Sequence, residues 1–214
     1  MSTRDHRQQL IEACRRMNDL GINQGTSGNA SVRVPKGFLV TPSAVPYGAM
    51  VPEDMVLMDL EGTVLDGARK PSSEWHIHRA VLAARPNAGA VLHAHPHHAT
   101  ALACLRRDIP AFHYMVAAGG GRDIRCAAYA TPSSETLADH VVEALEGRLA
   151  CLMANHGMLV LGRDLPEALD RALVVENLAT QYLLALQVAD PTLLDDDEMD
   201  RVLELFKTYG AEGG

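Results

Sequence analysis

A short apolar segment near the middle of the chain, residues 90–92, places the strongest constraint on the fold. Gly89 and Pro96 bound this Ala-Val-Leu run, which predicts a short, buried β-strand. Side chains alternate between the two faces of a strand, so His93 and His95 are expected to project from the same face. Two imidazoles on one rigid edge suit zinc or a similar divalent ion, although histidine is also an ordinary strand residue.

A third histidine follows another apolar run. Residues 149–154 are apolar, and Asn-His-Gly comes directly after them, which makes His156 the candidate third ligand. Glu74, upstream of the first two histidines, adds a carboxylate that can act as a base. A His-x-His pair alone is a weak indication of metal binding. The strand setting, the third histidine and the carboxylate together favour a metal site.

The composition predicts one globular domain that spans residues 1–214. Of the 214 residues, 47% are hydrophobic and 21% are charged, which provides enough apolar material for one substantial core. The formal net charge of −8 argues against nucleic acid or an anionic membrane surface as a partner. No apolar run is long enough to span a bilayer, so no membrane association is expected.

The N-terminus and the cysteines favour a cytoplasmic protein. The first residues, MSTRDHR, contain no apolar segment of the kind that a secretory signal requires. The four cysteines lie in apolar surroundings without zinc-finger or Cys-x-x-Cys spacing, and we expect them to be reduced core residues. They are Cys14, Cys104, Cys126 and Cys151.

Hydrophobic periodicity and turn residues predict both helices and strands. The helix at residues 164–188 is apolar on more than one face, which predicts burial in a core or a subunit interface. Other helices are expected at residues 5–20, about 74–84, 99–107, 133 or 134 to 145, and from the acidic run 195–198 to about Tyr209. Strands are expected at residues 31–34, 38–41, 56–60, 63–65, 124–128 and 149–154, besides the central one.

Several polar stretches have more than one interpretation. Ser72, Ser73 and Glu74 open a helix, where two serines can cap and the carboxylate can complement the helix dipole, and capping alone would explain them. Residues 23–31 suit either an anion-binding nest or a plain hairpin connection. His97 and His98 follow Pro96 and could extend the metal site, but we expect them to begin a helix or to lie behind the metal ligands. His76 and His78 are interpreted as surface or helix-packing residues. The acidic run is interpreted as a helix N-terminus.

Seven motifs in the same order identify a family resemblance that covers nearly the whole chain. The chain resembles the class II, zinc-dependent aldolases of the aldolase/adducin superfamily, and in particular the L-fuculose-1-phosphate aldolases. The motifs are GINQGTSGN at residues 21–29, TPS at 41–43, PSSEW at 71–75, HxH at 93–95, IPAxHYM at 109–115, NHG at 155–157 and FKTYG at 206–210.

The resemblance implies a single α/β domain with a central, mostly antiparallel sheet flanked by helices. It implies a homotetramer whose active sites lie between neighbouring subunits. The zinc ligands would be His93, His95 and His156, with Mn²⁺ or Co²⁺ as other possible ions. Glu74 would be the catalytic acid/base and would also bind the metal when substrate is absent.

The resemblance also assigns a phosphate pocket and two tyrosines. Tyr114 would donate a proton to the aldehyde oxygen across a subunit boundary, and Tyr209 would close the site. Backbone N–H groups, hydroxyls and a helix N-terminus would bind the phosphate without Lys or Arg. The pocket residues would be Gly28, Asn29, Thr41, Ser43, Ser72 and Ser73.

The implied reaction cleaves a ketose 1-phosphate, such as L-fuculose 1-phosphate, to dihydroxyacetone phosphate and an aldehyde. The metal would stabilise the developing enediolate, and the carboxylate would move the proton. Two positions depart from the pattern. Ala44 stands where the phosphate loop usually has glycine, and residues 132–134, Pro-Ser-Ser, replace a stretch that carries an aromatic beside the aldehyde.

These departures leave other activities open. A 5-deoxyribulose or 5-methylthioribulose 1-phosphate aldolase is the main alternative substrate assignment. A methylthioribulose-1-phosphate dehydratase and a pentulose-phosphate 4-epimerase would share the three histidines. The His-Tyr-Met at residues 113–115 favours an aldolase. An adducin-like scaffold domain without catalysis is the alternative from a different class.

Overall fold

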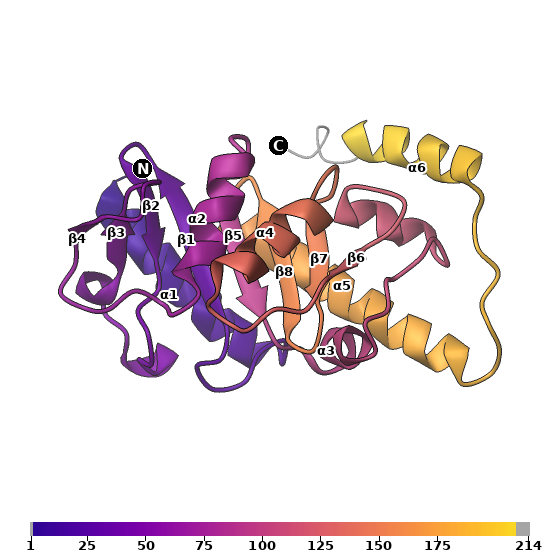
Figure 1. The fold of residues 1–214 in the computed structure, drawn as a ribbon, viewed down its shortest axis with the longest axis horizontal. Coiled ribbons are helices and arrows are strands. Elements are labelled where there is room, and N and C mark those ends of the chain that lie inside the picture. Colours follow the sequence, from indigo (N-terminus) through magenta and orange to yellow (C-terminus); the bar gives the residue numbers. More distant parts are fainter. Residues whose placement is uncertain (1, 209–214) are drawn as a thin grey trace.

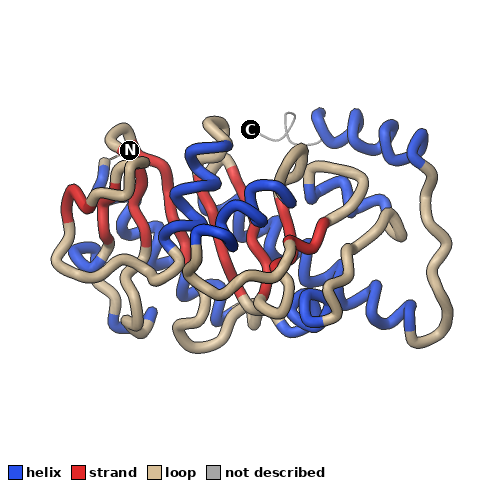
Figure 2. The backbone as a smooth tube through the Cα atoms, in the orientation of Figure 1, coloured by secondary structure: helices blue, strands red, loops and turns tan. Residues whose placement is uncertain are grey.

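The computed structural model describes residues 2–208, and the strands of this part form one eight-stranded sheet (Figures 1 and 2). Their order across the sheet is β4-β3-β2-β1-β5-β8-β7-β6. The strands are β1 (Asn29–Val34), β2 (Gly37–Val40), β3 (Val56–Met58), β4 (Val64–Asp66), β5 (Ala90–Ala94), β6 (Arg125–Ala127), β7 (Ala150–Met153) and β8 (Gly157–Gly162).

Helices connect these strands and cover the sheet. The α-helices are α1 (Thr3–Asp19), α2 (Trp75–Ala84), α3 (His97–Cys104), α4 (Glu135–Ala144), α5 (Leu165–Leu186) and α6 (Asp196–Thr208). Three short 3₁₀ helices, η1 (Tyr47–Ala49), η2 (Pro52–Asp54) and η3 (Tyr114–Gly119), lie in the loops. In Figure 1, an extended segment joins α5 to α6, which lies at one end of the molecule.

The sheet is antiparallel except where β6 pairs with β7. The centre is formed by strands that are distant in sequence, because β5 lies between β1 and β8. In this register Asn29 is opposite His93, and His93 is opposite Leu159. A single α/β domain with a mostly antiparallel sheet flanked by helices is therefore confirmed.

Each face of the sheet has its own core. The larger core packs α1, α3 and α5 against one face, and the smaller core packs α2 and α4 against the other. Leu92 lies in the first core and Val91 in the second, as strand alternation requires. His93 follows the same alternation, so its ring lies on the side covered by α2.

The predicted helices and strands agree with the structure apart from their bounds and one omitted strand. The long helix α5 begins after Asp164, whose side chain accepts a hydrogen bond from the Glu167 N–H at 2.9 Å. The helix predicted at 99–107 begins earlier, because His97 and His98 form its first turn, as their position after Pro96 suggested. Strand β8 was not predicted, although it is an apolar run that is buried along its length, as β5 is.

The acidic run begins α6 as expected, with Asp196, Asp197 and Glu198 in the first turn. Tyr209, predicted near the end of this helix, lies outside the described residues. Of the cysteines, Cys14 and Cys151 are buried, but the prediction of a core position is wrong for Cys104, which is exposed. None of the helices within residues 2–208 has both the length and the apolarity needed to cross a membrane.

Candidate metal centre

Three histidines from two parts of the chain converge at the end of β5. His93 is the fourth residue of the strand and His95 lies just beyond it, and their Nε2 atoms are 2.8 Å apart. His156 comes from the turn between β7 and β8, and its ring centre lies 4.8 Å from that of His93 and 5.0 Å from that of His95. One nitrogen from each ring can be chosen so that all three lie within 4.8 Å of one another.

The tight turn that holds His156 depends on Gly157. A Cβ atom at this position would lie 2.6 Å from the Ala94 carbonyl oxygen and 2.6 Å from Cδ2 of His95. Any side chain there would force the β7–β8 turn away from the end of β5. The Asn-His-Gly motif therefore supplies both a ring nitrogen and the close approach that the third histidine needs.

The carboxylate of Glu74 completes the cluster. Its two oxygens lie 3.2 Å from Nε2 of His93 and 3.2 Å from Nε2 of His156. Burial alone would raise the pKa of this carboxyl group, but the two histidines hold it well below its ordinary value. Within the described chain, Glu74 Oε1 and His156 Nδ1 are buried without a hydrogen-bond partner.

The ring nitrogens are arranged as metal ligands require. The Nδ1 of His93 donates to the Met158 carbonyl oxygen at 2.8 Å, which leaves Nε2 free to bind a cation. Burial, reinforced by the charge of neighbouring histidines, lowers the pKa of His95 to about 3 and keeps that ring neutral. Burial also lowers the pKa of His93, but the carboxylate outweighs this effect and raises it, so a cation would compete with that proton. The donor set fits a divalent metal ion.

Comparison with known proteins identifies this constellation. The family model described as "Class II Aldolase and Adducin N-terminal domain" matches residues 8–183. The chain belongs to the class II aldolase/adducin family. The histidine triad is consistent with the metal site of the class II aldolases.

Individual class II aldolases are similar over nearly the whole chain. A 5-methylthioribulose-1-phosphate/5-deoxyribulose-1-phosphate aldolase of Rhodospirillum rubrum is 54% identical over 201 residues, which cover 94% of this chain and 90% of that protein. The L-fuculose phosphate aldolase of Escherichia coli K12 is 46% identical over 203 residues, 94% of each chain. A solved structure of an L-fuculose 1-phosphate aldolase superposes with a TM-score of 0.92 and 40% identity, covering 95% of this chain and 96% of that one.

These likenesses make the chain a class II metal-dependent aldolase that acts on a sugar phosphate. The named relatives are aldolases, which sets aside the dehydratase, the epimerase and the adducin-like scaffold as interpretations. The fold of the solved aldolase also agrees with the single α/β domain described above.

The segments predicted to bind phosphate come together beside the metal centre of this aldolase. Thr41 O accepts from the Ser72 N–H at 2.9 Å, and the Ser43 N–H donates to Lys70 O at 3.0 Å. Ser43 and Ser73 are exposed, whereas Thr41 and Ser72 are buried. Backbone hydrogen bonds therefore hold residues 41–43 against the segment that leads to Glu74.

Gly28 and Asn29 reach the cluster from the start of β1. A Cβ atom on Gly28 would lie 2.7 Å from the His93 carbonyl oxygen, so only glycine allows β1 to lie this close to β5. The Asn29 amide nitrogen donates to Glu74 Oε2 at 2.9 Å. The structure thus joins the predicted phosphate residues to the carboxylate.

The capping prediction for α2 needs correction. Glu74 is the N-cap residue itself, and its side chain makes no capping hydrogen bond, because it is directed to the histidines. Ser72 Oγ accepts from the Glu74 N–H at 3.3 Å, which stabilises the turn before the helix rather than its first turn. Glu74 is thus committed to the cluster, and capping alone does not explain it.

Tyr114 lies apart from the other predicted residues. It begins η3, its ring stacks on His113 with centroids 4.8 Å apart, and 51% of the residue is exposed. The structure does not bring Tyr114 to the histidine cluster of its own chain. Tyr209 is outside the described residues, so both tyrosines keep the status of predictions.

Sequence reasoning missed one functional neighbour. His78 was predicted to be a surface or helix-packing residue, but it is fully buried and hydrogen-bonds to Asn29 and Ser31. The missed signal was spacing. His78 follows Glu74 by four residues, which places both on one side of α2.

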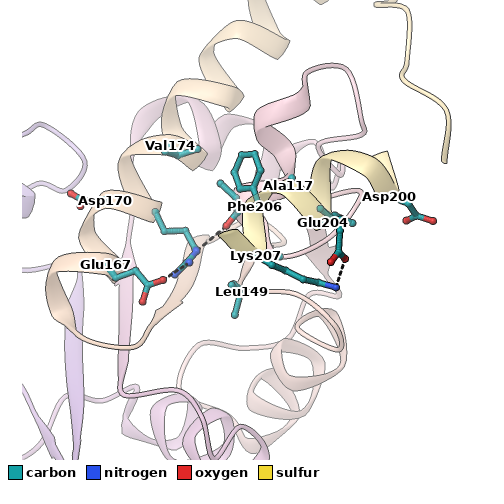
Figure 3. Close-up of a pocket in the computed structure, with 13 residues that line it drawn as sticks. Ala117, Leu149, Glu167, Asp170, Val174, Asp200, Glu204, Phe206 and Lys207 are labelled. Atoms are coloured by element: carbon teal, nitrogen blue, oxygen red, sulfur yellow. Dashed lines mark hydrogen bonds and ion pairs between the residues drawn. The ribbon is translucent and has the colours of Figure 1, made fainter. Parts of the chain in front are cut away.

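A cavity lies in another part of the molecule, away from the histidine cluster. It has a volume of about 770 Å³ and lies between α5, α6 and η3, where Val174, Phe206 and Leu149 give it an apolar lining (Figure 3). Its charged groups include two ion pairs, Arg171 with Glu167 at 3.0 Å and Lys207 with Glu204 at 2.5 Å. The cavity contains none of the predicted site residues.

Proposed function

We propose that this aldolase cleaves 5-deoxyribulose 1-phosphate or 5-methylthioribulose 1-phosphate to dihydroxyacetone phosphate and the corresponding aldehyde. The observation that supports this choice is the 54% identity to an aldolase named for both substrates, against 46% for an L-fuculose phosphate aldolase. The expectation of L-fuculose 1-phosphate from the sequence has weaker support. It remains the second candidate because of the fold similarity to that enzyme.

The proposed metal ligands are His93, His95 and His156, with Glu74 as a further ligand when substrate is absent. Zinc is the proposed ion, and Mn²⁺ or Co²⁺ would suit the same nitrogen donors. When bound, the cation supplies Lewis acidity at the ketone and its neighbouring hydroxyl.

The chain's own residues are proposed to move the protons. In the condensation direction, the Glu74 carboxylate takes a proton from the hydroxymethyl carbon of dihydroxyacetone phosphate. This carbon forms a bond to the aldehyde carbon, and Tyr114 donates a proton to the aldehyde oxygen. Cleavage reverses each transfer. The position of Glu74 supports this role, because its two carboxylate oxygens lie 3.2 Å from the ring nitrogens of His93 and His156, where the substrate would meet the metal.

Phosphate binding is assigned to neutral groups. The proposed pocket uses the backbone N–H groups and hydroxyls of the turns that precede β1 and α2, with the positive end of the α2 dipole nearby. The residues are Gly28, Asn29, Thr41, Ser43, Ser72 and Ser73. The formal charge of −8 is compatible with an anionic substrate, because overall charge acts mainly on the encounter rate.

The proposal includes a cytoplasmic homotetramer in which the whole chain, residues 1–214, forms one class II aldolase domain. Tyr114 would then serve a neighbouring subunit, which its 51% exposure supports. Tyr209 is proposed to close the site. Sedimentation analysis of the purified protein tests the assembly, and a monomer that retains full activity would contradict the shared site.

The proposed activity is tested with three substrates that differ in the aldehyde portion. Each of 5-methylthioribulose, 5-deoxyribulose and L-fuculose 1-phosphate is supplied separately, and release of dihydroxyacetone phosphate is followed by its enzymatic reduction. We expect the highest kcat/KM for the first two. A clear preference for L-fuculose 1-phosphate would establish the second candidate, and a diketone or an epimer in place of dihydroxyacetone phosphate would overturn both.

A further inference from the structure

A chain of buried polar side chains leads from the interior of the sheet to the proposed acid/base. Ser31, His78, Asn29 and Glu74 are 0%, 0%, 5% and 6% exposed. Consecutive members are joined by hydrogen bonds of 2.7, 2.6 and 2.9 Å. Buried polar groups need such partners, since an unpaired one is costly.

The direction of each hydrogen bond follows from the carboxylate. Glu74 can only accept, so Nδ2 of Asn29 donates to it, and Oδ1 of the same amide therefore faces His78. Nε2 of His78 must then carry the proton, and its Nδ1 accepts from the hydroxyl of Ser31. Burial lowers the pKa of His78 to about 3, so the ring is neutral and one tautomer satisfies both partners.

The fold brings these residues together for a simple reason. Asn29 and Ser31 are two apart on β1, so their side chains share one face of the sheet. They are paired with His93 and Val91 of β5, which places that face under α2. His78 lies one helical turn after Glu74 and projects onto this face.

We propose that His78 is a positioning residue for the reaction, which holds the Asn29 amide in the one orientation that presents its N–H to Glu74. If the amide flipped, its oxygen would face the carboxylate and repel it. The neutral imidazole favours this orientation when Nε2 carries the proton, because Nε2 then donates to Oδ1 of Asn29 while Nδ1 accepts from the Ser31 hydroxyl. The inference rests on the proposed role of Glu74 as acid/base.

The test compares two substitutions of His78 in the full-length, metal-loaded protein. His78→Leu removes the donor, and His78→Gln keeps an N–H at the position of Nε2. We expect His78→Leu to lower kcat by about 10- to 100-fold, the usual effect of losing a residue that orients an active-site ligand. His78→Gln should recover most of that loss, and KM should change less than kcat in both.

His76→Leu is the matched control. His76 lies on the same helix, its ring stacks on Trp75, and its Nδ1 is 3.9 Å from Glu135 of α4, away from β1. Its substitution should leave kcat unchanged. Metal content and thermal unfolding are measured for every variant, so that a loss of fold or of metal is recognised.

A double-mutant cycle with Asn29→Ala tests whether His78 acts through the amide. If it does, adding His78→Leu to Asn29→Ala should cause little further loss of kcat. If the fold decrease in kcat of the double variant equalled the product of the two single decreases, the proposal would be overturned. So would a His78→Gln variant as slow as His78→Leu, or an equal loss in the control.

A measurement without substrate separates this inference from the proposed function. Nuclear magnetic resonance of the free protein reports the His78 tautomer and the hydrogen exchange of the Asn29 side-chain amide. Exchange should be slow in the unsubstituted protein and in His78→Gln but fast in His78→Leu. Protonation at Nδ1 instead of Nε2 would overturn the positioning role. Failure to cleave any sugar phosphate, with the expected tautomer present, would count against the function alone.

Discussion

Two regions of this aldolase differ sharply in chemistry. The candidate metal centre at the end of β5 is a compact set of three imidazoles and one buried carboxylate, with contacts of 2.8 to 3.2 Å. The cavity beneath α6 is a space of about 770 Å³ with mostly apolar walls. A cavity of this volume could also hold a small ligand.

The chemistry favours the candidate metal centre as the active site. In the cavity, Arg171 is paired with Glu167, and Lys207 with Glu204, so these charges stabilise one another. In the metal centre, Glu74 Oε1 and His156 Nδ1 are buried without hydrogen-bond partners, among the described residues. Buried polar groups that lack a protein partner point to a ligand or a catalytic role. The candidate site is therefore located by the convergence of three imidazoles and a buried carboxylate rather than by a cavity.

The largest expected effect comes from removing a metal ligand. His95→Ala should lose the bound metal and lower kcat/KM by about 10³-fold or more, because Lewis-acid stabilisation contributes several kcal/mol. Metal content of the purified protein and cleavage kinetics measure both effects. His98→Ala is the control, since His98 contacts Glu176 at 2.8 Å instead of the cluster. Equal metal loss in the control would remove the distinction between ligand and non-ligand histidines.

The next effect separates proton transfer from metal binding. Glu74→Gln should keep the metal through the three histidines and lower kcat by about 10²- to 10⁴-fold, the usual contribution of a general acid/base. Elemental analysis and kcat are measured together. Glu135→Gln, a change at an exposed carboxylate of α4, should leave both unaltered. Unchanged kcat in Glu74→Gln would refute the acid/base role.

The sequence predicted the residues of the candidate metal centre better than the buried residues behind them. His93, His95 and His156 were identified because strand alternation and local motifs are visible over a few residues. The role of His78 was not, because it depends on β1 lying beside β5 and on α2 covering both. Such strand pairing is non-local, and no short-range pattern encodes it.

The contrast between local patterns and non-local packing also applies to the predicted elements of the fold. Helix α5 was predicted almost to its ends, because Asp164 and the apolar periodicity act locally. Strand β8 was missed, although it is apolar and buried along its whole length in the same way as β5. The cavity also could not be predicted, since α6 meets α5 and η3 only in the tertiary structure.

The next prediction concerns the stability of the protein against acid. The pKa of His78 falls from 6.5 to about 3 on folding, so the unfolded chain binds the proton more readily. Its contribution to stability is complete above pH 6.5 and is lost as the pH falls towards 3. Urea unfolding of the metal-free protein measures this effect. Between pH 6.5 and about 3, the free energy of unfolding should fall less steeply with pH in His78→Gln than in the unsubstituted protein, by about 1.4 kcal/mol per pH unit. Equal pH dependence of the free energy of unfolding in the two proteins would contradict the inference that His78 is buried in its neutral form.

A smaller effect is expected at the phosphate edge of the metal centre. Ala44 has a φ of 57°, in the left-handed region that glycine adopts more readily. Ala44→Gly should stabilise the protein by about 0.5–1 kcal/mol and should not weaken substrate binding. Thermal unfolding and KM measure the two effects. Destabilisation would show that a side chain at this position makes contacts that outweigh the backbone strain.

The smallest effect is expected in the cavity beneath α6, where Val174 is only partly buried. Val174→Ala enlarges a space that already exists, so we expect a loss of stability of about 0.5 kcal/mol. The kcat and metal content should remain those of the unsubstituted protein, because the cavity shares no residue with the metal centre. Thermal unfolding and steady-state kinetics measure both. A fall in kcat without a fall in metal content would show that the two regions are coupled, and the cavity would then have to be included in the catalytic unit.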